Sequence, residues 1–186
     1  MSYPNLKQRA SAILTADAWR RACLEAAAEL ALPDWAIGAG FVRNAIWDEL
    51  HGHTEATPLN DLDLIYFDPH DRSPERDRAL EARLSALLPA PWSVKNQARM
   101  HLKHGHAPYR GSLQALGQWV EVATCVGVRL EGGRCRFLAP FGLGDNFRLL
   151  IRANPLNPRP ELVRRRIREK GWLTRWPRLT LLETLP

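Results

Sequence analysis

The chain has 186 residues, enough for one domain with one main core, and 45% of them are hydrophobic. Its 26 lysines and arginines outnumber 20 aspartates and glutamates, and the net charge of +6 favours anionic partners such as nucleotides or nucleic acid. Three cysteines without a C-x-x-C pair indicate a reducing, cytoplasmic compartment. No stretch approaches the roughly 20 apolar residues of a membrane span, and the N-terminus lacks the apolar region of a signal peptide.

The first third of the chain alternates helical and strand patterns. Residues 7–32 have the apolar spacing of an amphipathic helix, with Thr15 or Asp17 as the cap of a second helix. A short apolar run at 35–37 predicts a strand, and the glycines that follow it predict a tight turn. Helical spacing resumes at 41–50 and ends at a glycine, which is typical of a C-terminal cap.

The remaining elements are taken from runs of apolar residues and from prolines. We expect strands at 62–67 and 92–96, with a helix at 74–88 between them. A short helix at 112–118 follows. We then expect a strand at 119–130 that forms a hairpin with 135–138, and a helix at 143–151. Three prolines at 154–160 predict a linker, and 161–170 predicts a basic helix.

This order predicts an α/β (α+β) fold with a small mixed β-sheet, helices mainly on one side, N-terminal helices and a C-terminal basic helix. We expect three parts. They are an N-terminal helical segment packed on the core (1–33), a main domain (34–153), and a Pro-rich linker with a basic helix (154–186).

Two acidic residues flank a leucine at the start of the second predicted strand. Asp61 and Asp63 are two residues apart, so in a strand their carboxylates project from the same face. Mg²⁺ or Mn²⁺ would relieve their mutual repulsion, because hard divalent cations prefer oxygen ligands. A solvated strand edge is the alternative interpretation of an Asp-x-Asp pattern.

A glycine-rich turn precedes the helix at 41–50. Gly38, Ala39 and Gly40 lie between a strand and a helix, where free backbone N–H groups and the helix dipole favour an anion. Arg43, one turn into the helix, can add a bidentate phosphate contact. The alternative is a turn that uses glycine for close packing. Together, a phosphate cradle and a pair of metal-binding acids suit phosphoryl or nucleotidyl transfer.

Several motifs resemble those of known nucleotidyltransferases. Residues 39–44 with Asp61-Leu62-Asp63 resemble the Gly-Gly-x-Val-Arg-Asp and Asp-x-Asp signature of the head domain of tRNA CCA-adding enzymes and bacterial poly(A) polymerases, in the DNA polymerase beta superfamily. Residues 120–124 are similar to the Glu-Val-Ala-Thr strand of those enzymes. The span 35–176 looks still closer to a family of small bacterial nucleotidyltransferase-fold proteins, through the stretches 37–44, 60–63, 94–101 and 139–143.

The resemblance implies a nucleotidyltransferase fold and a catalytic domain over 34–153. It implies that Asp61 and Asp63 bind two divalent metals (Mg²⁺ or Mn²⁺), that Glu121 is the third catalytic and metal-binding carboxylate, and that Gly40 and Arg43 hold the triphosphate of an NTP. The chain departs from the CCA-adding pattern at Ala39, which replaces a glycine, and at Asn44, which replaces an aspartate.

Further candidate contacts to the nucleotide lie on either side of the acid pair. Asn44 stands where the CCA-adding pattern has an aspartate, and Lys95 and Arg99 follow the strand expected to flank the metal strand. The complete set of candidate nucleotide-binding residues is Gly38, Ala39, Gly40, Arg43, Asn44, Lys95 and Arg99. The histidines of residues 101–106 are interpreted as part of a polar loop rather than a metal cluster.

The C-terminal segment is the most basic part of the chain. Residues 159–178 contain eight lysines or arginines against two glutamates, together with Trp172 and Trp176. Basic and aromatic residues in this combination make nucleic acid a candidate partner. The alternative is core packing, because Val163 and Ile167, like the two tryptophans, are four residues apart on one helix face.

The function expected from these features is metal-dependent transfer of a nucleoside monophosphate from an NTP to an unknown acceptor, with release of pyrophosphate. An alternative is a catalytically inactive nucleotidyltransferase-fold protein that binds nucleotide or RNA. A third is a phosphohydrolase that uses the same acids with water as the acceptor.

Overall fold

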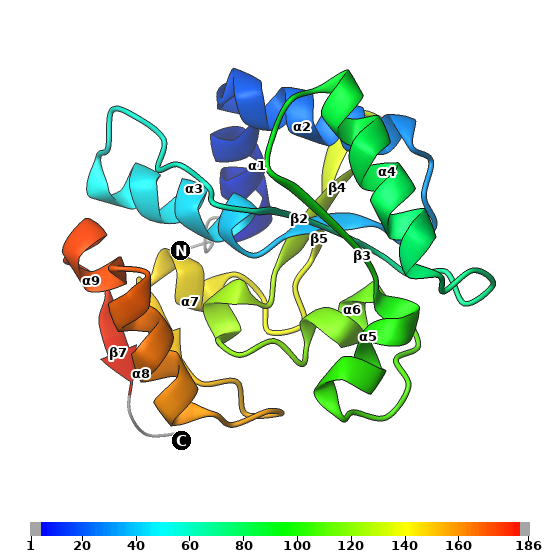
Figure 1. Cartoon of the computed structure of the whole chain (residues 1–186). Coiled ribbons are helices and arrows are strands. Elements are labelled where there is room, and N and C mark those ends of the chain that lie inside the picture. The colour runs from blue at the N-terminus through cyan, green and yellow to red at the C-terminus, as the bar shows by residue number, and fades with distance from the viewer. Residues whose placement is uncertain (1–4, 183–186) are drawn as a thin grey trace.

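A computed structural model describes residues 5–182 (Figure 1). Its main sheet has five strands in the order β3-β2-β1-β4-β5, and only the β2–β3 pair is parallel. The sheet is therefore mixed, as predicted. The strands are β1 (Ala36–Gly38), β2 (Leu62–Tyr66), β3 (Trp92–Asn96), β4 (Gly127–Glu131) and β5 (Arg134–Leu138).

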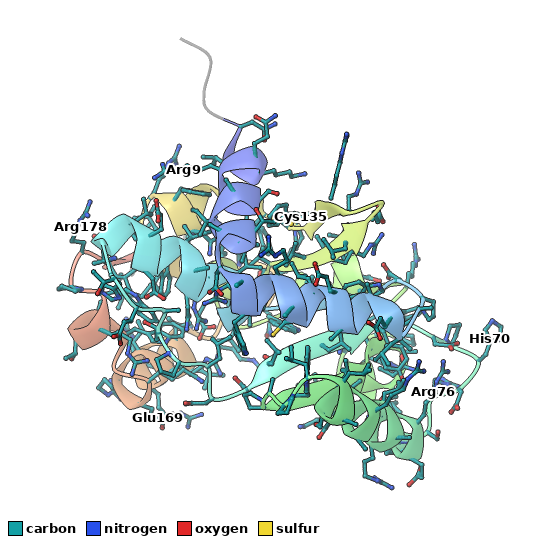
Figure 2. All side chains as sticks on the ribbon, turned by 90° about the horizontal axis from the view of Figure 1, so that it is seen from above. Arg9, His70, Arg76, Cys135, Glu169 and Arg178 are labelled. Carbon is teal, nitrogen blue, oxygen red and sulfur yellow. The ribbon has the colours of Figure 1, made fainter. Side chains whose placement is uncertain are left out.

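Four helices cover one face of this sheet, which confirms the prediction that helices lie mainly on one side (Figure 2). They are α1 (Leu6–Ala16), α2 (Ala18–Glu29), α3 (Gly40–His51) and α4 (Pro74–Leu87). Side chains alternate along a strand, so Ile37 and Leu64 pack against these helices, whereas Ala36 and Ile65 face the other side. There the short helix α6 (Ser112–Leu116) contributes Leu116 to a smaller cluster.

The N-terminal helical region is two helices broken at Asp17. The Asp17 side chain accepts hydrogen bonds from the backbone N–H groups of Trp19 (2.9 Å) and Arg20 (3.1 Å), so it is the cap of α2. Arg20 is buried and donates to the carbonyl oxygen of Phe41 (2.5 Å). This bond ties α2 to the first turn of α3, which begins the candidate site.

Three local predictions were wrong. Residues 119–130 are not one strand, because the Thr124 hydroxyl bonds back to the Glu121 carbonyl (2.7 Å) and turns the chain through the 3-10 helix η1 (Val122–Thr124) before β4. The helix expected at 143–151 is α7 (Gly144–Phe147) followed by β6 (Leu150–Arg152), with a positive φ at Leu149 between them. The expected polar loop after β3 is the helix α5 (Gln97–His104), capped by Asn96.

The C-terminal segment forms a second core with α3. It contains α8 (Pro160–Glu169), α9 (Trp172–Arg175) and β7 (Thr180–Leu182), which pairs in parallel with β6. Trp172 and Trp176 pack against Trp47 of α3, and Val163 and Ile167 of α8 complete the cluster. Residues on both sides of the boundary predicted between 153 and 154 therefore share one core, and α8 and α9 lie beside α3 in Figure 1. No helix within residues 5–182 is long and apolar enough to cross a membrane.

Candidate active site

The acid pair lies where β2 begins. Leu62 and Leu64 are completely buried, while Asp61 is exposed and Asp63 is half-buried on the opposite face of the strand. Both aspartates line a cavity of about 310 Å³ at the start of α3, here called the α3 cavity. Burial, and next to it the charge of Asp61, raises the pKa of Asp63 to about 6. Two oxygen-donor groups whose charges repel are a donor set that suits a hard divalent cation.

The turn between β1 and α3 faces the same cavity. Ala39 and Gly40 both line it, and the helix that starts at Gly40 has no side-chain cap at its N-terminus. The N–H groups of Val42 and Arg43 donate to the Ala39 carbonyl (3.2 and 3.0 Å), which leaves those of Gly40 and Phe41, at the very start of the helix, to bind an anion. Gly38 is different. A Cβ there would lie 3.0 Å from the Trp119 ring, so close packing explains this glycine.

Arg43 is held rigidly at the cavity wall. Its guanidinium lies over the rings of Trp172 (4.4 Å to the centroid) and Trp47 (5.1 Å), and its Nε and one Nη donate to Asn44 Oδ1 at 3.1 and 2.9 Å. Burial lowers the pKa of Arg43 to about 10, so it remains charged at neutral pH. Asn44 therefore orients Arg43, and both side chains line the α3 cavity.

Glu121 has a different setting from the two aspartates. Its side chain is completely buried, one carboxylate oxygen accepts from Nε of Arg166 on α8 (2.5 Å), and the other accepts from the Thr124 hydroxyl (3.1 Å). Between residues 5 and 182, no three His, Cys, Asp or Glu side chains are grouped so that they could hold a metal ion. The structure thus does not group Glu121 with Asp61 and Asp63, and its carboxylate is paired with Arg166 instead.

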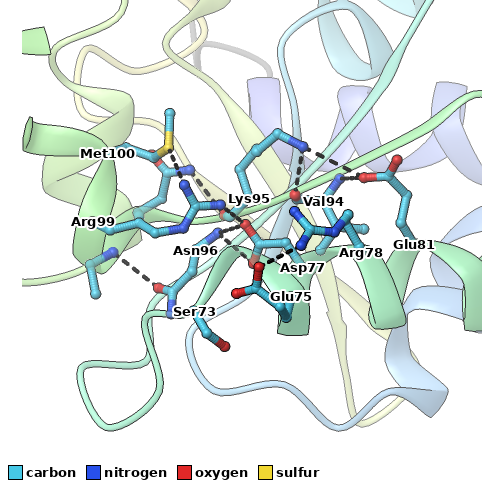
Figure 3. Close-up of polar contacts among 12 residues, drawn as sticks. Ser73, Glu75, Asp77, Arg78, Glu81, Val94, Lys95, Asn96, Arg99 and Met100 are labelled. Carbon is cyan, nitrogen blue, oxygen red and sulfur yellow. Dashed lines mark hydrogen bonds and ion pairs between the residues drawn. The ribbon is translucent and has the colours of Figure 1, made fainter. Parts of the chain in front are cut away.

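Of the candidates Lys95, which lies in β3, and Arg99, which follows it in α5, only Lys95 borders a cavity near the acids. Lys95 Nζ donates to the Val94 carbonyl (2.9 Å) and lies 3.5 Å from the carboxylate of Glu81 (Figure 3). Arg99 forms an ion pair with Asp77 of α4 instead. Asp77 is buried and needs a counter-charge, so Arg99 joins α4 to α5 and its guanidinium is not brought to the acid pair.

A second cavity meets the first at Asp63. It has a volume of about 410 Å³, borders α5 and is here called the α5 cavity. Ala39, Asp63 and Arg166 line both cavities. The remaining wall of the α5 cavity is rich in basic side chains, namely Lys95, Lys103, His104, His106 and Arg159.

Sequence reasoning missed the basic residues that the C-terminal segment adds to the α3 cavity. Arg166, Lys170 and Arg175 line it together with the aspartates, and the charge of Lys170 acts to lower the pKa of Asp63. A signal was present, since Arg166 and Lys170 are four residues apart and share a helix face. The sequence predicts a solvent-exposed or nucleic-acid-binding face for these residues, because nothing local indicates that the segment returns to α3.

This sheet and its cavity define the class of protein. A family model described as nucleotidyltransferase matches residues 25–181, and the chain therefore belongs to this nucleotidyltransferase family. A search of curated proteins found no match.

Solved structures agree on the fold. The chain is similar to a protein whose NMR structure was described as revealing a CCA-adding enzyme head domain, with 32% identity, a TM-score of 0.82 and 96% of each chain covered. It also resembles a tRNA-processing enzyme in an apo form, with 16% identity and a TM-score of 0.52 over 98% of this chain and 45% of that one. The second likeness shows the fold alone.

Proposed function

We propose that this protein transfers a nucleoside monophosphate from an NTP to an acceptor hydroxyl and releases pyrophosphate, with Asp61 and Asp63 holding Mg²⁺ or Mn²⁺. One observation carries the proposal. The acid pair, the uncapped N-terminus of α3 and the buried Arg43 border a single cavity. These are the groups needed to bind metal ions and a triphosphate in one place.

Each group has a defined role in this reaction. Bound metal ions would neutralise charge on the phosphates and on the attacking and leaving oxygens. The first backbone N–H groups of α3 and the guanidinium of Arg43 bind the triphosphate, and Asn44 holds Arg43 in place. Lys170 adds a further cation on the same wall.

The acceptor enters through the α5 cavity, which shares Asp63 with the triphosphate site. Its basic lining favours an anionic acceptor, and an RNA end is the one to test first. The three cysteines are free thiols, in keeping with the cytoplasm as the compartment of the reaction.

Calorimetry tests the site directly. Titration with Mg²⁺ and each NTP is expected to show metal-dependent nucleotide binding that the Asp61→Ala/Asp63→Ala double variant loses. Glu75→Ala, an exposed acid on α4, is the control. Unchanged nucleotide binding in the double variant would overturn the metal-site assignment.

A second candidate is a protein that binds nucleotide or RNA without catalysis. It is favoured by the ion pair of Glu121 with Arg166, which leaves Asp61 and Asp63 as the two of the three candidate metal ligands that line the α3 cavity. Incubation with labelled NTPs and a pool of cellular RNA, protein and metabolites separates the two functions. Metal-dependent label transfer that is lost in Asp63→Asn rules out the binding protein, and release of free phosphate in place of pyrophosphate would indicate a hydrolase.

A further inference from the structure

Glu121 and Arg166 form an ion pair between two distant parts of the chain. They are 45 positions apart, and Arg166 Nε lies 2.5 Å from a carboxylate oxygen of Glu121. Glu121 is 0% exposed, and an isolated carboxylate at such a depth would be strongly disfavoured. Arg166 supplies the compensating charge, so each residue fixes the position of the other.

The second oxygen of the Glu121 carboxylate points into the protein interior. It lies 3.1 Å from the hydroxyl of the buried Thr124, whose single proton is shared with the Glu121 carbonyl at 2.7 Å, and Glu121 lines neither cavity. The Glu121 backbone is also held, by a bridge to Ala153 beside β6. Ligation of a metal would require Glu121 to leave Arg166 and Thr124, and the carboxylate does not fit the role of third metal ligand that the motif resemblance implies.

Arg166, in contrast, lies at the wall of the candidate active site. It lines both cavities, a property that it shares with Asp63 and Ala39. Glu121 engages its Nε, and over residues 5–182 no protein group accepts a hydrogen bond from its two Nη groups. Arg43 and Arg166 both line the α3 cavity, and the charges of Glu121 and Arg166 both act on Arg43. A guanidinium held at one edge presents its other donors in a fixed fork, which suits phosphate oxygens.

We propose that Arg166 is a phosphate-binding residue of the nucleotidyltransferase site and that Glu121 is its positioning residue rather than a metal ligand. This inference rests on the proposed function. The C-terminal helix α8 then supplies part of the active site itself, where the sequence suggested a separate surface for nucleic acid. Glu121 makes no contact with the substrate itself and acts by orienting Arg166.

The test separates metal binding from triphosphate binding. Mn²⁺ alone, and then a non-hydrolysable ATP analogue with Mn²⁺, are titrated calorimetrically into the wild-type protein, Glu121→Gln, Arg166→Gln and the double variant. Asp63→Asn is the reference for loss of a metal ligand. Arg165→Gln, an exposed arginine on the same helix, is the matched control. Thermal unfolding of every variant checks that the substitutions leave the protein folded.

We expect Glu121→Gln and Arg166→Gln each to weaken analogue binding about tenfold, the effect of losing one charge-assisted hydrogen bond. Mn²⁺ affinity should stay within about twofold of wild type in both, and the double variant should be no weaker than the worse single variant by more than about twofold, because the two residues act as one unit. Arg166→Lys should recover part of the analogue affinity, since it restores the charge without the fork.

Three results would overturn the inference. Loss of Mn²⁺ binding in Glu121→Gln, as large as in Asp63→Asn, would make Glu121 a metal ligand. Unchanged analogue binding in Arg166→Gln would remove Arg166 from the substrate. A lowered unfolding temperature with unchanged analogue affinity would reduce the pair to a structural contact. Mn²⁺ binding that survives Asp63→Asn contradicts the proposed function instead, and the Glu121→Gln titration still reports whether Glu121 is a ligand.

Discussion

Ala39 has a backbone conformation that side chains disfavour. Its φ of 49° and ψ of −117° lie where a Cβ crowds the backbone, and its N–H is fixed by a bond to the Val126 carbonyl (2.9 Å). Glycine, which the similar signature of CCA-adding enzymes has at this position, adopts such a conformation without a Cβ clash. Strain of this kind persists only where the surrounding structure imposes it, in this case between β1 and α3.

Ala39→Gly should therefore stabilise the protein by about 1 kcal/mol, the relief of strain exceeding the entropy that glycine loses on folding. Chemical denaturation measures the difference. Ala12→Gly, at an exposed position inside α1, is the control and should cost about 1 kcal/mol. Destabilisation by Ala39→Gly would mean that the turn carries no strain.

Asp63 predicts a dependence of stability on pH. Its folded pKa of about 6 lies above the ordinary value of 3.8, so the native state holds a proton that the unfolded chain has released. The free energy of unfolding should fall as pH rises from about 4 to about 6 and stay lower above that. Asp63→Asn should remove this component and be more stable than wild type at pH 7.5 by about 1–2 kcal/mol, after a discount for partial exposure.

Urea unfolding at several pH values, without divalent metal, measures this difference between the two proteins. Glu55→Gln, an exposed acid in the loop before β2, is the control. Added Mg²⁺ should then stabilise the wild-type protein and leave Asp63→Asn unchanged. If Asp63→Asn were less stable than wild type at pH 7.5, the charged carboxylate of Asp63 would not destabilise the folded protein.

At the scale of elements, α3 is shared by two cores. Its Phe41 and Ile46 pack in the sheet core, and its Trp47 packs with Trp172 and Trp176 of the C-terminal segment. Trp176 also donates from Nε1 to Asp48 Oδ1 (2.8 Å). The helix that carries Arg43 is thus fixed from both sides, which explains how a buried guanidinium is held at a cavity wall.

Trp176→Phe should lower the free energy of unfolding by about 2–3 kcal/mol, because it leaves a void and removes a hydrogen-bond donor from the buried Asp48. Trp19→Phe is the matched control, since Trp19 is 38% exposed, and should cost less than about 1 kcal/mol. Chemical denaturation of both variants measures the contrast. Equal effects would mean that the second core does not stabilise α3.

At the scale of the whole molecule, the C-terminal segment belongs to the same folded unit as the sheet. Arg166 reaches Glu121, Trp176 reaches Asp48, and Asn154 donates to the carbonyls of Gly117 and Trp119 at 2.7 Å. These contacts join residues far apart in the chain. We therefore expect cooperative unfolding of the whole protein.

A chain truncated after residue 153 should not fold cooperatively, because it exposes Trp47 and Ile151, which are both fully buried. Circular dichroism and tryptophan fluorescence during urea titration measure this. The full chain should show one calorimetric transition. A cooperative transition in the truncated chain would show that the sheet folds without the C-terminal segment.

The sequence by itself determined the elements and motifs that depend on neighbouring residues. The apolar patterns predicted strands at 62–67 and 92–96 and a helix after Pro74, within one residue of β2, β3 and α4, and local signals offered Thr15 or Asp17 as the cap of α2. The two-residue spacing of Asp61 and Asp63 was enough to place them on one face of a strand, because a strand alternates its side chains.

Only the tertiary structure decided what the candidate residues contact. The local sequence makes both Glu121 and Arg99 candidate functional residues. In the fold, Glu121 pairs with Arg166 and Arg99 pairs with Asp77. The return of α8 and α9 to α3 brings Arg166 and Lys170 to the acid pair, and long-range packing of tryptophans drives it. Periodicity reports which face of a helix is apolar, but it carries no information about the distant surface that this face will meet.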